Sequence, residues 1–270
     1  MPNLSISRIS ISTTEWSPLP ANAKGYALAI GDVHGKAALL YALHERARDL
    51  ALANQEKRPT LIRLGDLIDR GENSIAALDL ANVGLGLPWV QESNLVGNHE
   101  QMLTLAITHE NMEIRHFMVQ QWLGNGGTAM LDNLNLGIEY ATPEAINSAL
   151  GEDRTRFLSN LQVAHRMGNV LFVHAGLNPS IDVREFLSRG IDFWPEENEE
   201  SPFWIRDAFL HYDEPHPAGL FVVHGHTIEP AGPTLRRHRL GIDLGSSQTG
   251  RICMAEIDGN RYRCHIASEF

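Results

Sequence analysis

The chain has 270 residues, of which 43% are hydrophobic and 20% are charged, which is typical of a globular protein with one large domain or two small ones. No apolar run is long enough to cross a membrane and no secretory signal pattern opens the chain, so we expect a cytoplasmic protein without membrane attachment. The net charge of −11 creates a surface that repels nucleic-acid backbones, so we expect no nucleic-acid partner.

The first half of the chain alternates between predicted strands and helices. Residues 1–24 carry no clear pattern, and we interpret them as a loose N-terminal arm. Short apolar runs that stop near a glycine predict buried strands at 26–30, 60–64 and 93–96. Apolar positions at helical spacing predict helices at 36–54, 72–83, 100–123 and 143–160, with a break at Asn125-Gly126-Gly127.

The second half is mostly strand. Residues 178–219 are rich in Pro, Glu and Asp, and we interpret them as a long surface excursion that forms a rim or lid. Strands are predicted at 161–165, 170–173, 220–223, 240–243, 251–257 and 261–266. This order of elements predicts an α/β fold in one domain, with two sheets and helices on the outside.

The two cysteines, Cys253 and Cys264, cannot build a disulfide framework or a cysteine-based zinc site. Between them, Asp258-Gly259 is a hairpin signal. If these two residues form the loop, the cysteines face each other across the two strands. We interpret them as buried thiols.

Five short motifs each place a glycine and polar side chains after a predicted strand. They are GDVHG at 31–35, GDLIDRG at 65–71, GNHE at 97–100, HAG at 174–176 and HGHT at 224–227. Side chains at the carboxyl ends of strands converge in one crevice. Asp, His and Asn suit manganese, iron or zinc, and do not suit copper(I) or an iron–sulfur cluster. With one bridging carboxylate, six such residues can hold two cations that activate water and clamp phosphoryl oxygens.

Together these motifs resemble those of the phosphoprotein phosphatases, a branch of the calcineurin-like metallophosphoesterases, and in particular the serine/threonine-specific bacterial and lambda-phage-type enzymes. The motifs span residues 31–227, which is most of the chain. The resemblance implies a four-layer α/β/β/α sandwich with two central mixed sheets. It also implies a single metallophosphoesterase catalytic domain over residues 25–270.

The resemblance further implies a role for each motif residue. Two divalent ions per chain, manganese in preference to iron or zinc, would be held by Asp32, His34, Asp66, Asn98, His174 and His226, with Asp66 bridging. His99 would protonate the leaving alkoxide, and Asp69 would orient His99. Arg70, Arg206 and Asn98 would bind the substrate phosphate. A hydroxide bridging the two ions would attack phosphorus in line, without a covalent phosphoenzyme.

Some positions leave alternatives open. Arg206 is either the second phosphate-binding arginine or a surface arginine on an amphipathic helix. His224 either contacts the metal or points to the other side of its strand. Glu100 either supports a ligand or begins a helix. The aromatic residues of the excursion either contact substrate or pack the loop onto the body; they are Trp194, Phe203 and Trp204.

The function predicted from these residues is a serine/threonine protein phosphatase, monomeric, acting on a phosphorylated protein or a small phosphomonoester. The alternative is a symmetrical diadenosine tetraphosphate hydrolase, a family that shares the first three motifs. Such an enzyme needs a basic lining for the polyphosphate, which the acidic segment PEENEES at 195–201 disfavours. A non-catalytic phosphate-binding scaffold is disfavoured because no ligand is missing and both His99 and Asp69 are present.

Overall fold

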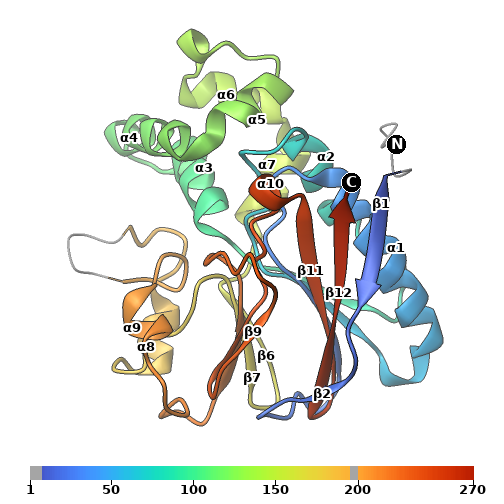
Figure 1. The fold of residues 1–270 in the computed structure, drawn as a ribbon. Coiled ribbons are helices and arrows are strands. Elements are labelled where there is room, and N and C mark those ends of the chain that lie inside the picture. The colour runs from blue at the N-terminus through green and yellow to red at the C-terminus, as the bar shows by residue number, and fades with distance from the viewer. Residues whose placement is uncertain (1–7, 195–199) are drawn as a thin grey trace.

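The computed structural model describes residues 8–194 and 200–270, so residues 1–7 of the expected arm and 195–199 of the acidic excursion lie outside the described residues. Two β-sheets face each other, and helices cover the outer face of each sheet (Figure 1). This arrangement confirms the predicted four-layer α/β/β/α fold. In the described part of the chain, no helix combines the length and apolar character needed to cross a membrane.

The larger sheet has seven strands in the order β1-β12-β11-β3-β4-β5, with β2 paired to β12. Strands β3, β4 and β5 are parallel, with β5 at the edge of the sheet, and β11 joins β3 in an antiparallel pair. The strands are β1 Ile9–Thr13, β2 Ser17–Pro18, β3 Tyr26–Ile30, β4 Thr60–Arg63, β5 Gln91–Asn94, β11 Arg251–Asp258 and β12 Arg261–Glu269.

The smaller sheet has five strands in the order β6-β7-β8-β10-β9. Here β7, β8 and β10 are parallel, and the two edge strands are antiparallel to their neighbours. The strands are β6 Ala164–Met167, β7 Val170–Val173, β8 Phe221–His224, β9 Thr234–Leu235 and β10 Arg239–Gly241.

The helices fall into groups on either side of the sheets. Helices α3, α4, α5 and α6 gather at one end of the two sheets (Figure 1). The expected helix at 100–123 is divided between α3 and α4, and the one at 143–160 divides at Gly151. The helices are α1 Ala37–Ala53, α2 Ser74–Val83, α3 Asn98–Thr108, α4 Met112–Trp122, α5 Thr128–Asn133, α6 Pro143–Leu150, α7 Glu152–Ser159, α8 Val183–Ser188, α9 Asp207–Leu210 and α10 Ser246–Thr249. Three short turns complete them, at Gln55–Lys57, Leu123–Gly127 and Ile138–Tyr140.

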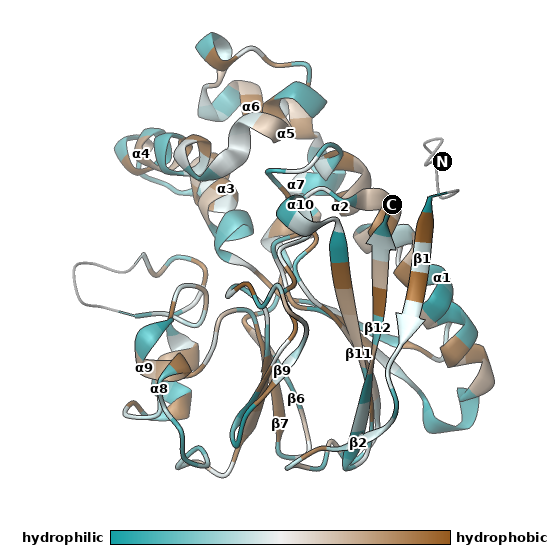
Figure 2. Ribbon diagram, in the orientation of Figure 1, coloured by the Kyte–Doolittle hydropathy of each residue, from teal (hydrophilic) through white to brown (hydrophobic). Residues whose placement is uncertain are grey.

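The period of two along β3 divides its side chains between two apolar cores. Leu28 and Ile30 pack on the helical side of the larger sheet, whereas Ala27 and Ala29 lie between the two sheets. Apolar strands buried on both faces read as continuous hydrophobic runs, which is why YALAI was recognisable in the sequence. The hydropathy colouring shows apolar residues along the strands of both sheets (Figure 2).

The first strand corrects one expectation. Residues 9–13 were expected within a loose arm, but they form β1, which pairs antiparallel with β12 at the edge of the larger sheet. Only Ile9 of this strand is half-buried, so the segment lacks the apolar pattern that marks an interior strand. The division of the chain into an arm and one catalytic domain otherwise stays a prediction.

The excursion at 178–219 is more compact than expected. It contains the helices α8 and α9, and it buries Phe186, Phe203 and Phe209 completely. Phe186 and Phe209 pack with Val222 of β8 on the outer face of the smaller sheet. The segment therefore supplies the fourth layer of the fold as well as a rim.

The C-terminal hairpin has a different register from the expected one. Residues 259–260 form the loop, in place of 258–259, because Gly259 adopts the left-handed conformation with φ 61°. Cys253 consequently pairs with Ile266, and Cys264 is its diagonal neighbour. Both thiols are free and buried, as predicted.

Candidate metal centre

The candidate residues lie at the carboxyl ends of strands from both sheets. Asp32 and Asp66 follow β3 and β4, and Asn98 opens α3 after β5. His174 and His226 follow β7 and β8 of the smaller sheet. Because the two sheets face each other, these strand ends bring side chains from five elements into one buried cluster.

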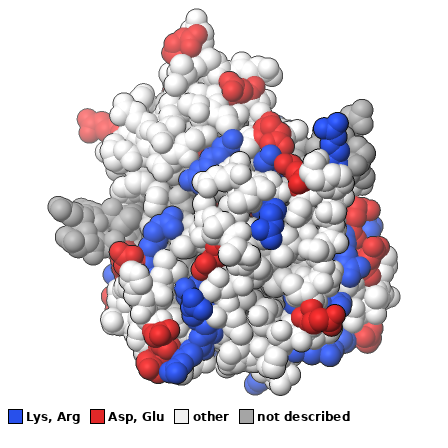
Figure 3. Space-filling model, viewed as in Figure 1, with Lys and Arg blue, Asp and Glu red and all other residues white. Residues whose placement is uncertain are grey.

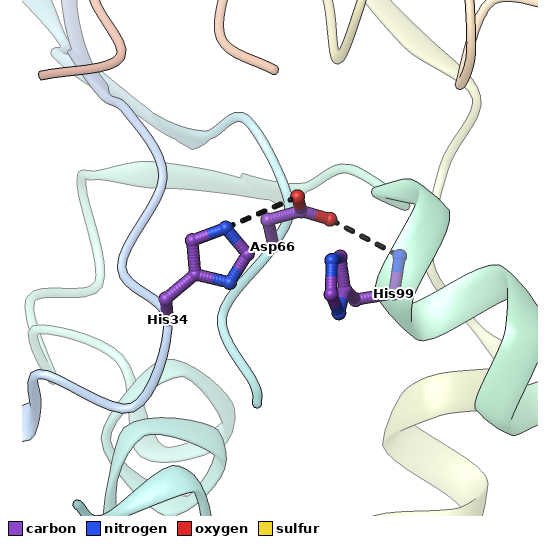
Figure 4. A group of neighbouring side chains, drawn as sticks. All are labelled: His34, Asp66 and His99. Atoms are coloured by element: carbon purple, nitrogen blue, oxygen red, sulfur yellow. Dashed lines mark hydrogen bonds and ion pairs between the residues drawn. The ribbon is translucent and has the colours of Figure 1, made fainter. Parts of the chain in front are cut away.

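The first group of potential ligands contains His34, Asp66 and His99, all buried, with one donor atom from each within 4.8 Å of the others. His34 Nε2 lies 3.5 Å from Asp66 Oδ2, and the backbone N–H of His99 donates to Asp66 Oδ1 at 3.2 Å. Figure 4 shows the three side chains approaching from separate segments of the chain. This group contains His99, whereas the resemblance implied that Asp32 would bind the same ion as His34.

The second group contains Asp66, His174 and His226, again with donor atoms within 4.8 Å of one another. His174 Nε2 lies 3.5 Å from Asp66 Oδ1. Asn98 Oδ1 lies 3.1 Å from His174 Nε2 and 2.9 Å from His226 Nδ1. Asp66 thus belongs to both groups, with one oxygen near each, which is the arrangement that a bridging carboxylate requires.

The carboxylate of Asp32 lies beside these two groups. It contacts Asp243, a residue that was not among the candidates selected from the sequence. Its oxygens accept the backbone N–H of His226 at 3.2 and 3.0 Å, and the Asp243 side chain lies against it. Burial raises the pKa of Asp32 well above its usual value, and the charges of Asp243 and Asp66 raise it further. Asp243 follows the apolar stretch 240–242, so the pattern of an acid after a strand could have revealed it.

The imidazole orientations fit the binding of divalent cations. His34 Nδ1 lies 3.0 Å from the carbonyl oxygen of Ile68, and His174 Nδ1 lies 2.9 Å from that of Leu64. Such carbonyls fix the ring and leave Nε2 facing the site. Burial lowers the pKa of His34 to about 3, which keeps its ring in the neutral form that binds metal. The buried Nε2 of His226 has no hydrogen-bond partner within the described residues, as expected of an atom that binds a metal ion.

His99 and Asp69 form a buried pair beside the first group. His99 Nδ1 lies 2.7 Å from Asp69 Oδ2, and both side chains are fully buried. Burial lowers the pKa of the His99 imidazole, but the carboxylates of Asp66 and Asp69 outweigh burial and leave this pKa above its usual value. His99 Nε2 has no partner among residues 8–194 and 200–270, so it is free to hold a proton for a substrate.

Two exposed arginines flank the two groups. Arg70 Nη1 lies 3.0 Å from His34 Nε2, next to the first group. Arg206 Nη1 donates to Thr227 Oγ1 at 3.0 Å, one residue from His226. Burial lowers the pKa of His226 well below its usual value, and the charges of His174 and Arg206 lower it further. Arg206 is thus an exposed arginine beside the second group, and its phosphate-binding role stays a prediction.

His224 and Glu100 lie behind the ligands. His224 Nε2 lies 3.2 Å from Arg239 Nη1, and its ring packs against Phe209, so it belongs to neither ligand group. Glu100 is fully buried and accepts the backbone N–H groups of Asp66 at 2.7 Å and Leu67 at 2.8 Å. It fixes the loop that carries Asp66 while also occupying the first turn of α3.

The backbone at the site is unusual for residues with side chains. Several candidate residues adopt the left-handed region, which costs energy and concentrates at functional sites. They are His34 (φ 42°), Asp66 (φ 49°), Asp69 (φ 71°), Arg70 (φ 64°) and His226 (φ 61°). The neighbouring glycines allow close approach, since a side chain at Gly225 would collide with the Asp32 carboxylate.

The structure bears out packing for two aromatic residues of the excursion, since Trp194 and Trp204 pack partly buried against the apolar core on the helical side of the larger sheet. Phe203 is fully buried. Trp204 borders the site, with its ring centroid 6.2 Å from that of His226 and its Nε1–H donating to Gln101 Oε1 at 2.7 Å. Trp194 lies edge-on to Trp204 at 5.3 Å.

Comparisons with known proteins agree with this fold. Residues 26–250 match the family model described as calcineurin-like phosphoesterase. A structure titled "Crystal structure of a putative diadenosine tetraphosphatase" matches with a TM-score of 0.52 and 22% identity, covering 92% of this chain and 98% of that one. The cold-active protein-tyrosine phosphatase of the psychrophile Shewanella sp. matches with a TM-score of 0.53 and 15% identity, covering 86% of this chain and 77% of that one. At these identities the likeness shows a shared fold. The search of curated proteins gave no match.

Proposed function

The chain belongs to the calcineurin-like phosphoesterase family, and from that premise we propose that it is a phosphomonoester hydrolase whose substrates are phosphoserine and phosphothreonine in proteins. The family and the two ligand groups make it a metal-dependent hydrolase of phosphoesters. Two divalent cations, with manganese preferred, would neutralise charge on the phosphoryl oxygens and acidify the attacking water. We assign their binding to Asp32, His34, Asp66, Asn98, His174 and His226.

The buried pair of His99 and Asp69 is the observation that carries this proposal. A serine or threonine alkoxide is a poor leaving group unless it receives a proton as the P–O bond breaks. His99 Nε2 is buried without a partner among the described residues, and Asp69 holds the opposite ring nitrogen at 2.7 Å. In the proposed reaction the water oxygen forms the new bond to phosphorus, and the departing oxygen takes its proton from His99 Nε2.

In this proposal, the phosphoryl group is positioned by Arg70, Arg206 and Asn98. The guanidinium groups present planar donors that match two phosphoryl oxygens at once. Arg70 lies beside the first ligand group and Arg206 beside the second. Although the chain is acidic overall, basic side chains lie across the middle of the face shown in Figure 3.

Arg206→Ala is expected to raise the KM for a phosphoserine peptide about tenfold, because a charged hydrogen bond to the substrate is lost. We expect a smaller effect on kcat, since Arg206 takes no part in the proposed proton delivery by His99. Arg237→Ala is the matched control, because Arg237 is an exposed arginine that pairs with Glu214. Steady-state kinetics at saturating manganese measures both constants. Unchanged kinetics in Arg206→Ala would remove Arg206 from the substrate site.

A symmetrical diadenosine tetraphosphate hydrolase is the second candidate. The observation in its favour is the aromatic border formed by Trp204 and Trp194, whose flat faces are of the kind on which bases stack. The leaving group from diadenosine tetraphosphate is a nucleoside diphosphate. It departs as a stable anion, so protonation by His99 contributes little to its departure. The His99–Asp69 pair therefore favours the phosphomonoesterase.

The deciding experiment measures hydrolysis by metal-stripped protein reloaded with manganese, as phosphate release from phosphopeptides and as ADP formation from diadenosine tetraphosphate. Phosphoserine, phosphothreonine and phosphotyrosine peptides are compared with diadenosine tetraphosphate under the same conditions. We expect turnover of the phosphoserine and phosphothreonine peptides with little cleavage of the dinucleotide. Preferential cleavage of the dinucleotide would replace the proposed substrate with the second candidate and leave the ligand assignments in place.

A further inference from the structure

The carboxylate of Asp69 has a second partner besides His99. Trp122, the last residue of α4, is fully buried and donates its indole N–H to both carboxylate oxygens, at 2.9 Å to Oδ1 and 2.8 Å to Oδ2. The Oδ2 oxygen also faces His99 Nδ1 at 2.7 Å. The three side chains thus form one chain of contacts, from the indole through the carboxylate to the imidazole.

The turn that follows Trp122 is built around this contact. Residues 123–127 connect α4 to α5, and Gly126, with φ 108°, forms a kink between the two helices. A side chain at Gly127 would collide with the indole of Trp122, so glycine allows the ring to lie against the backbone.

The same turn also contacts Arg70, the residue after Asp69. The carbonyl oxygen of Gly126 accepts the backbone N–H of Arg70 at 3.2 Å, and that of Asn125 accepts Arg70 Nε at 3.4 Å. A side chain at Gly126 would collide with the side chain of Arg70. One short segment therefore fixes both Asp69 and Arg70, which are consecutive residues of the GDLIDRG motif.

From this geometry we propose that Trp122 is a positioning residue, whose indole N–H fixes the Asp69 carboxylate so that His99 Nε2 points at the leaving oxygen. With His99 as its only donor, the carboxylate could rotate, and the imidazole would follow it. A second donor, which is rigid and fully buried, fixes the plane of the carboxylate and with it the direction of the ring. This inference rests on the proposed phosphomonoesterase function and deepens it, because it concerns proton delivery alone.

Trp122→Phe tests the proposal, since it keeps an aromatic ring in the core and removes the N–H. Turnover of a phosphoserine peptide is expected to fall about ten- to a hundredfold, the cost of misplacing a catalytic group. Turnover of 4-nitrophenyl phosphate is expected to change less than about twofold, because its phenolate leaves without a proton. The KM for both substrates and the manganese content are expected to match those of the wild type.

Two companion variants make the comparison specific. Trp89→Phe is the matched control, because Trp89 precedes the amino end of β5 and its indole N–H has no partner within the described residues. It is expected to leave both turnovers unchanged. Replacing Trp122 with 3-benzothienylalanine preserves the shape of the ring but lacks the N–H, so it gives the same test if Trp122→Phe does not fold.

The outcomes separate this inference from the proposed function. Selective loss of phosphoserine turnover in the Trp122 variants supports the positioning role. Equal loss on both substrates would show that Trp122 acts only through general packing, and no loss on either would show that its N–H is dispensable; both results overturn the inference and leave the proposed function intact. A wild-type protein that hydrolyses neither phosphomonoester overturns both.

Discussion

Asp66→Asn is expected to lower phosphomonoester turnover by about 10⁴-fold or more, a loss typical of removing an essential catalytic group. Among the described residues, Asp66 is the carboxylate that both ligand groups share, with Oδ2 3.5 Å from His34 Nε2 and Oδ1 3.5 Å from His174 Nε2. Asparagine replaces one of these oxygens with an N–H₂ group that repels a cation and removes the negative charge. Both cation sites therefore weaken together.

The measurement pairs turnover with the metal content of purified protein. We expect the Asp66→Asn variant to hold clearly fewer than the two manganese ions per chain proposed for the wild type. Asp79→Asn is a suitable control, because it makes the same chemical change on α2, where Asp79 pairs with Arg154. It is expected to keep both the activity and the metal. Wild-type turnover in Asp66→Asn would refute the shared bridging position.

His99→Asn is expected to lower turnover of a phosphoserine peptide about 10²- to 10⁴-fold, the usual contribution of a general acid. Asparagine holds no transferable proton, so the alkoxide must leave unprotonated. Turnover of 4-nitrophenyl phosphate is expected to fall much less. His211→Asn, a change at an exposed histidine of the excursion, is the matched control for the substitution.

Metal content decides how His99 participates. His99 lies within one ligand group together with His34 and Asp66, yet its Nδ1 is engaged by Asp69. If His99 is the acid, the variant keeps about two ions per chain and loses only proton delivery. Loss of one ion would move His99 into the ligand set and require another residue as the acid.

The sequence by itself determined the strands that carry the site and the chemistry gathered at their ends. Buried parallel strands such as Tyr26–Ile30 are continuous apolar runs, and this signal is local. A glycine and a polar residue directly after each run are equally local. Those two signals were sufficient to select Asp32, Asp66 and His174, which the fold then brings into one buried cluster.

Only the tertiary structure decided which partners support those residues. Trp122 donates to Asp69 across 53 residues of sequence, and the Asp32 carboxylate meets the backbone of His226 across 194. Neither contact produces a periodic pattern in the amino-acid sequence. Asp243 beside Asp32 was also missed, although an acid that follows an apolar run is a local signal in the sequence.

The remaining errors have the same physical origin. Edge strand β1 is stabilised by its pairing with the distant strand β12, and its own side chains are mostly exposed. The excursion at 178–219 is polar over much of its length, yet phenylalanines within it pack against an apolar face of the smaller sheet. Local sequence specifies the period and the end of an element, whereas edge pairing, register and buried polar contacts depend on residues that only the folded chain brings together.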